Sequence, residues 1–264
     1  MNSLTPQDTQ VLREAVARLE KQSFAMTVAA KVGMPVEGLV RLLPAPVQHK
    51  VGGAVNKALE QCLQVALAAG RGALPTAPRN RTHTLLTAAT GAAGGFFGLP
   101  GMLVELPVTT TLMLHSIAEI ARSHGEDLNQ PDAALACLEV LALGPDGSQN
   151  DLIESAYYTT RAALAQVTRD AVAYLAQKGV AKEGTPVLVS FLAKIAARFG
   201  LEVSEKAAAQ LVPVAGAVGG LALNVLFTQH FQQIAEGHFA VRALERRYGP
   251  LPVRHAYEAL QASA

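Results

Sequence analysis

Apolar side chains recur every three to four residues along most of this chain, which is the spacing of one face of an α-helix. Proline and glycine interrupt the pattern, and residues 5–8 (Thr-Pro-Gln-Asp) have the capping residue, the first-turn proline and the acidic residue typical of a helix start. The pattern predicts helices over residues 6–32, 36–43, from 46 to about 69, 131–143, 151–178 and 185–199, with a charged helix near the C-terminus and a short one after Pro252.

Two long segments depart from this pattern because they carry no charge. Residues 82–104 and 207–235 contain no Asp, Glu, Lys or Arg, and both are rich in glycine. In the first, we expect a helix that breaks over residues 98–101 and resumes toward Arg122, which makes a helical hairpin. Glycines four residues apart give a helix a flat strip that another helix can approach closely. The pairs with this spacing are Gly91 with Gly95, Gly94 with Gly98, and Gly216 with Gly220.

These patterns predict an all-α fold. We expect one compact multi-helix bundle over residues 1–264, in which the two Gly-rich apolar segments pack centrally as helical hairpin segments. The composition agrees, because Ala and Leu favour helix and Trp is absent. Half of the residues are hydrophobic and only 16% are charged, compared with about 25% in typical soluble domains. We therefore expect this chain to work close to a membrane or an apolar partner.

Charge and cysteine content narrow the function further. The net charge of +1 gives no electrostatic reason to expect nucleic acid as a partner, because nucleic-acid binding needs concentrated positive charge. Cys62 and Cys137 lie far apart without a CxxC pattern, so neither a disulfide framework nor a cysteine-based metal site is expected. The first residues lack the basic start and apolar stretch of a signal peptide, so we expect a cytoplasmic location.

The first uncharged segment is long enough for a membrane, since a 23-residue helix spans roughly 35 Å. However, this segment is interrupted by residues 98–101 and then by Glu105, and the second segment contains Gln210 and Asn224. Buried core helices are therefore the favoured interpretation, followed by peripheral or re-entrant membrane contact and last by a spanning helix. In a membrane-bound hairpin, four apolar residues near the turn would enter the surface: Phe96, Phe97, Leu99 and Met102.

Histidine and glutamate side chains suggest a second hypothesis, a metal or acid–base site. His115 and Glu119 lie one turn apart on a predicted helix, and His230, Glu236 and His238 follow in or after the second apolar segment. Two histidines and a carboxylate would suffice for zinc if the segments packed together. Compact signatures such as HExxH are absent, so ordinary side chains at helix ends are the favoured interpretation.

Glu105 is a separate candidate because apolar residues lie on both sides of it. Val104 precedes it, and Leu106 and Pro107 follow. If the residue is buried, we expect hydrogen bonds or a cation such as Arg161 to hold its carboxylate. If it is not buried, it faces water or a ligand pocket.

Three stretches carry a resemblance to a known family. They are GAAGGFFGLPGMLVELPVTTTLMLHSIAEIARSHGEDL, ESAYYTTRAALA and RFGLEVSEKAAAQLVPVAGAVGGLALNVLFTQHF, and a weaker likeness extends from about Leu12 to Tyr248. The chain resembles the EcsC family of bacterial proteins in these stretches. The resemblance implies a membrane-associated or cytoplasmic protein, in a family named after a gene that accompanies an ABC transporter linked to secretion. It implies no catalytic, cofactor-binding or metal-binding residues.

The sequence thus predicts a membrane-proximal helical protein that is not an enzyme. We expect it to be cytoplasmic, peripheral at the inner face of the membrane, and to bind lipid or a membrane transporter or secretion component, without a cofactor. The alternative is a metal- or carboxylate-dependent hydrolase that uses His115, Glu119 and His230.

Overall fold

The computed structural model describes residues 4–20, 24, 44–69, 98–144, 156–178, 184–210 and 217–263. These residues form helices, and they contain no strand, so the predicted all-α class is confirmed. The helices are α1 (Pro6–Leu19), α4 (Ala45–Ala69), α6 (Gly98–Ser123), α7 (Pro131–Glu139), the 3-10 helix η1 (Val140–Ala142), α8 (Ala156–Lys178), α9 (Pro186–Gln210), α10 (Ala217–Tyr248) and α11 (Pro250–Ala262).

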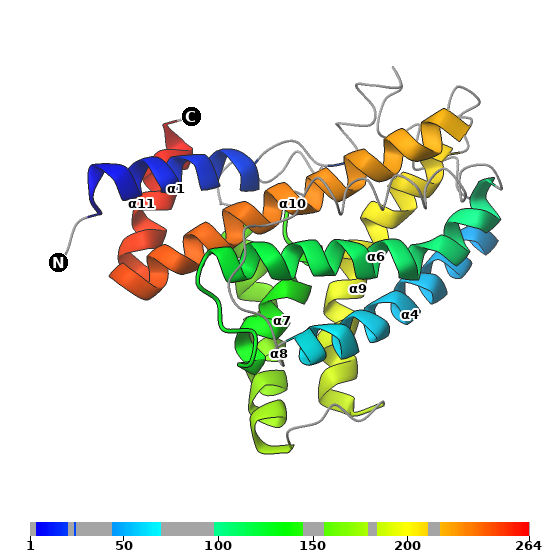
Figure 1. Ribbon diagram of the computed structural model, residues 1–264, viewed down its shortest axis with the longest axis horizontal. Helices are drawn as coiled ribbons and strands as arrows, with labels where there is room; N and C mark the ends of the chain where they lie inside the picture. The colour runs from blue at the N-terminus through cyan, green and yellow to red at the C-terminus, as the bar shows by residue number, and fades with distance from the viewer. Residues whose placement is uncertain are drawn as a thin grey trace.

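The longest of these helices, α10, runs through most of the length of the molecule (Figure 1). α1 and α11 pack on its C-terminal half, and α6 packs along it on another side. α4 lies against α6, α7 and α9. α4 and α6 both begin at the right-hand end of Figure 1 and run in the same direction. α9 ends and α10 begins at this same end, so four helix ends meet there.

Two groups of side chains form the centre of the core. α7 and η1 are apolar on nearly all sides, as expected for a helix enclosed by others, and every residue from 133 to 143 is buried. The second group is aromatic and joins α9 to α10. Phe227 lies 5.1 Å from Phe231, 6.1 Å from Phe199 and 5.0 Å from Phe24, measured between ring centres.

Several predicted helix limits are wrong. α1 ends at Leu19, well before residue 32. α6 begins at Gly98, so residues 98–101 are its first turn and not a break. Proline is tolerated there because the first backbone N–H groups of a helix have no acceptor within the helix. α9 continues through Gly200, and α10 is one helix where two were predicted.

Much of the predicted glycine hairpin lies outside the described residues. The residues outside include Gly91, Gly94 and Gly95 of the first apolar segment and Gly216 of the second. The helix predicted over residues 36–43 also lies outside the described residues. Among the described glycines, Gly237 of α10 permits the closest approach of another helix. The spacing of glycines in the sequence did not indicate this position. A Cβ at Gly237 of α10 would lie 2.7 Å from Leu19 Cγ and 3.2 Å from the backbone oxygen of Ala15, both in α1.

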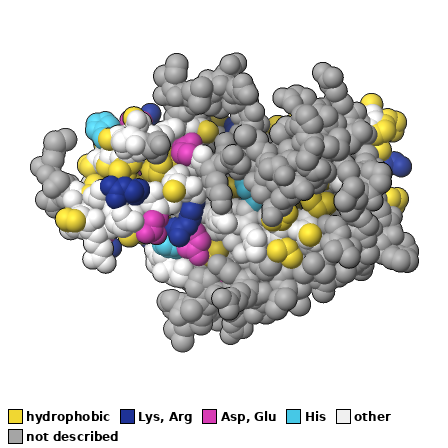
Figure 2. All heavy atoms as spheres, turned by 90° about the horizontal axis from the view of Figure 1, so that it is seen from above, with side chains coloured by type: hydrophobic (Ala, Val, Ile, Leu, Met, Phe, Trp, Pro, Cys, Tyr) yellow, Lys and Arg dark blue, Asp and Glu magenta, His cyan; other side chains and the backbone are white. Residues whose placement is uncertain are grey.

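Charged side chains of both signs mix on the surface. Figure 2 shows Lys and Arg side chains beside Asp and Glu on the face viewed from above. One such pair joins the start of the chain to the end of α10, where Arg247 Nη1 lies 2.7 Å from Asp8 Oδ1. The Tyr248 hydroxyl also donates to Asp8, at 2.6 Å. This mixing agrees with a net charge near zero, and the described residues of that face offer no single-sign field for a polyanion.

Candidate functional site

The inner face of α6 carries a buried carboxylate near the start of the helix. Glu105 is only 9% exposed, so of the two alternatives left open by the sequence, the buried one holds. Its Oε1 accepts a hydrogen bond from Thr109 Oγ1 at 2.5 Å, one helical turn later. The same oxygen accepts from Nδ2 of Asn224, a fully buried residue of α10. These contacts join the N-terminal half of α6 to α10.

A buried lysine from α9 completes this polar cluster. Lys206 is fully buried, and its Nζ lies 4.8 Å from the centre of the Phe227 ring and has no hydrogen-bond partner among the described residues. Burial lowers the pKa of Lys206 to about 8, although the negative charge of Glu105 acts in the opposite direction. The predicted cation, Arg161, was wrong because it binds Glu245 at 2.8 Å. Among the described residues, Lys206 is a buried cation on which the charge of Glu105 acts.

Near the N-terminal end of α6, its outer face is apolar and exposed. Val104 is 80% exposed and Val108 is 52% exposed, one turn apart. Met102 and Leu106 point the other way and are buried. We call Val104 and Val108 the valine stripe. Because the cluster around Glu105 fixes the rotation of α6 about its axis, it also sets which residues form this stripe. Met102, predicted to meet a membrane, is in the core instead; Phe96 and Phe97 lie outside the described residues.

α6 also passes a test of length and composition for membrane helices. Within its 24 residues from Pro100 to Ser123, the most apolar 18-residue window has a mean hydropathy of 1.2, and 61% of that window is buried within the protein. A single helix of this kind is weak evidence for a span, because the core helix of a soluble protein passes the same test. The exposed remainder of the helix includes the valine stripe.

The residues of the predicted metal site face different neighbours. His115 of α6 lines a small apolar cavity with Val65 of α4 and Cys137 of α7. His230 of α10 has its Nε2 3.2 Å from Oε2 of Glu202 in α9. Within the part of the chain that the structure describes, no group of three His, Cys, Asp or Glu residues is placed to hold a metal ion. The hydrolase alternative stays a prediction.

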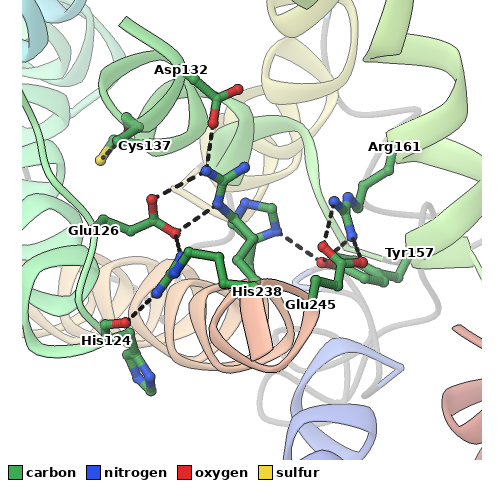
Figure 3. A network of polar contacts seen from close by, with 11 residues as sticks. His124, Glu126, Asp132, Cys137, Tyr157, Arg161, His238 and Glu245 are labelled. Carbon is green, nitrogen blue, oxygen red and sulfur yellow. Dashed lines mark hydrogen bonds and ion pairs between the residues drawn. The ribbon is translucent and has the colours of Figure 1, made fainter. Parts of the chain in front are cut away.

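A second polar network surrounds the C-terminal half of α10 (Figure 3). His238 is fully buried, and its Nδ1 lies 3.0 Å from the hydroxyl oxygen of Tyr157 in α8. Burial, and then the charges of Arg161 and Arg242, hold the pKa of His238 well below its usual value, so the ring is neutral. Arg161 makes two hydrogen bonds to Glu245, at 2.8 and 3.0 Å. This part of the network joins α8 to α10.

The other half of the network joins α10 to the connection between α6 and α7 and to the first turn of α7. Arg242 donates to Glu126 at 2.8 and 3.1 Å and to Asp132 at 2.7 Å, and Arg246 also pairs with Glu126 (Figure 3). Sequence reasoning missed these pairs. The only signal was the spacing of four between Arg242 and Arg246, which places both on one face of a helix. The network orients α10 against its neighbours, and its arginine charges are matched by carboxylates, as in a structural clamp.

Comparison with known proteins gives one result. Residues 73–244 match the model of the EcsC protein family, a range that includes α6 to most of α10. No curated protein and no solved structure matches the chain.

Proposed function

Because this chain belongs to the EcsC protein family, we propose that it is a membrane-proximal helical protein that contacts a lipid surface through the valine stripe of α6. The contact is peripheral, at the cytoplasmic face of a membrane, and it needs no catalysis. The observation that carries the proposal is the exposure of Val104, at 80%, and of Val108, at 52%, one turn apart on the same helix. Exposed apolar side chains grouped on one helix face are typical of interaction sites.

The polar cluster favours a peripheral contact over insertion. If α6 entered the lipid, Glu105 would lose Asn224 and Lys206, and a charged side chain at the centre of a bilayer costs about 2.5–3.5 kcal/mol or more. The valine stripe can meet lipid without that loss, because the two faces of α6 are separate. Two largely exposed valines contribute roughly 2–3 kcal/mol on burial, which gives weak and reversible binding.

Sedimentation with lipid vesicles tests this proposal. The full chain should pellet with the vesicles, and Val104→Ser with Val108→Ser should return it to the supernatant. Val189→Ser is the matched control, because Val189 is also 51% exposed but lies near the start of α9, away from the N-terminal end of α6. Wild-type protein that stays in the supernatant would contradict lipid contact and would point to a membrane transporter or secretion component as the partner of the stripe.

A further inference from the structure

α4, which packs against α6, carries two lysines near its start. Lys50 and Lys57 are both exposed, and neither forms an ion pair with any residue that the structure describes. Residues 44–59 contain no Asp or Glu, and Glu60 is the first acidic residue after them. On α6, Glu105 points inward to Asn224 and is not part of this surface. The start of α4 is therefore a locally basic, solvent-facing surface.

Contacts between α4 and α6 set the level of these lysines along the helix pair. Val65 of α4 and His115 of α6 line the same small cavity, so these two positions face each other. Lys57 lies eight residues before Val65, and Val108 lies seven residues before His115, so each is about two turns back on its own helix. Because the two helices run in the same direction from the same end (Figure 1), Lys57 and Val108 lie at the same level. Lys50 is seven residues earlier on the same ridge of α4.

We propose that Lys50 and Lys57 bind the phosphate groups of anionic phospholipids while the valine stripe enters the apolar boundary below them. This inference rests on the proposed lipid contact and names its lipid class. An apolar stripe alone gives weak attachment, and stable peripheral binding needs a second signal such as basic residues near the headgroups. Lysine suits this role, because its ammonium is a flexible point charge that reaches phosphates from the side of a helix.

Vesicles of two compositions test the proposal with the full chain. One set is pure phosphatidylcholine, and the other contains about one third phosphatidylglycerol. Wild type should partition more strongly into the anionic vesicles, and Lys50→Gln with Lys57→Gln should reduce that partitioning by about five-fold per lysine, or roughly 30-fold together. Glu60→Gln should strengthen anionic binding, since it removes the nearest acidic residue of α4. High salt should weaken anionic binding in wild type and have little effect on the lysine variant.

A matched variant separates the local effect from net charge. Lys178→Gln with Lys194→Gln removes two exposed lysines of α8 and α9 and should bind anionic vesicles like wild type. Equal wild-type binding to both vesicle types would overturn the anionic-lipid inference and leave the lipid contact intact. Equal loss in the two double lysine variants would also overturn it, because net charge would then explain the preference. Binding to neither vesicle type would contradict the proposed function itself.

Discussion

Gly237 gives a sharp test of how α1 and α10 pack. Replacing it with alanine adds one methyl group at a point where the two helices nearly touch. The new Cβ would lie 2.7 Å from Leu19 Cγ, which is about 0.7 Å closer than ordinary van der Waals contact, and 3.2 Å from the oxygen of Ala15. Leu19 can change its side-chain angles, but the Ala15 oxygen is backbone. α1 as a whole must therefore move away from α10.

The expected magnitude follows from two opposing effects. Alanine improves helix propensity over glycine by about 1 kcal/mol. Overpacking a tight contact typically costs about 1–3 kcal/mol. We expect Gly237→Ala to destabilise the protein by roughly 1–2 kcal/mol, because the shift of α1 also disturbs Leu12 and Val16, which are buried in the core.

Gly52 of α4 provides the matched control. A Cβ there has nothing within 4 Å, so the same substitution keeps only the gain in propensity. Gly52→Ala should stabilise the protein by about 0.5–1 kcal/mol. Urea unfolding followed by far-UV circular dichroism would measure both changes. If Gly237→Ala is as stable as Gly52→Ala or more so, the close approach of α1 and α10 is wrong.

Three further predictions concern buried ionisable groups. Glu105→Ala should lower the free energy of unfolding by roughly 3 kcal/mol or more, because it leaves Lys206 and the Asn224 amide in the core without the carboxylate. A melting curve like that of wild type would reject the buried cluster. Since the pKa of Lys206 is about 8 when folded and near 10.5 when unfolded, the unfolded chain binds more protons between these values, and unfolding free energy should rise with pH. Between pH 7 and 9 this rise should be roughly 1 kcal/mol greater than in Lys206→Met, and urea titrations that show equal slopes for the two proteins would refute the assignment. Cys62 and Cys137 are buried, and burial raises the pKa of each thiol to about 12. A thiol reagent at pH 8 should therefore label them only after denaturation, and rapid labelling of the folded chain would contradict their placement.

The starts of α1, α7 and α9 could be predicted from the sequence because capping residues and prolines are local signals. The hydroxyl oxygen of Thr5 accepts from the backbone N–H of Asp8, as predicted for a cap, and prolines open α7 and α9 as expected. Helix ends were less predictable, since glycine stops a helix only where packing does not support it. Gly200 and Gly237 both lie inside continuous helices, and at Gly237 the missing side chain makes room for α1.

The apolar surroundings of Glu105 in the sequence left open whether it is buried, and they did not indicate its partners. Asn224 is 119 positions away, and only the packing of α6 on α10 brings the two together. In the sequence, Lys206 directly precedes the uncharged segment 207–235. However, it lies seven residues after the buried Phe199, so the helical phase already pointed it inward. The exposure of Val104 and Val108 could not be predicted, because it depends on how α6 is rotated by these contacts.

The central claim is that the outer face of α6 touches lipid, and a fluorophore attached at that face tests it most directly. Val104→Cys adds one exposed thiol, while the two native cysteines are buried and stay unlabelled under native conditions. A polarity-sensitive dye at this position should shift to the blue when anionic vesicles are added, and lipids with a quencher near the headgroup should quench it. The same dye at Val189→Cys should show neither change. If the dye at position 104 reports water in the presence of vesicles that sediment with the protein, the membrane contact does not lie on α6.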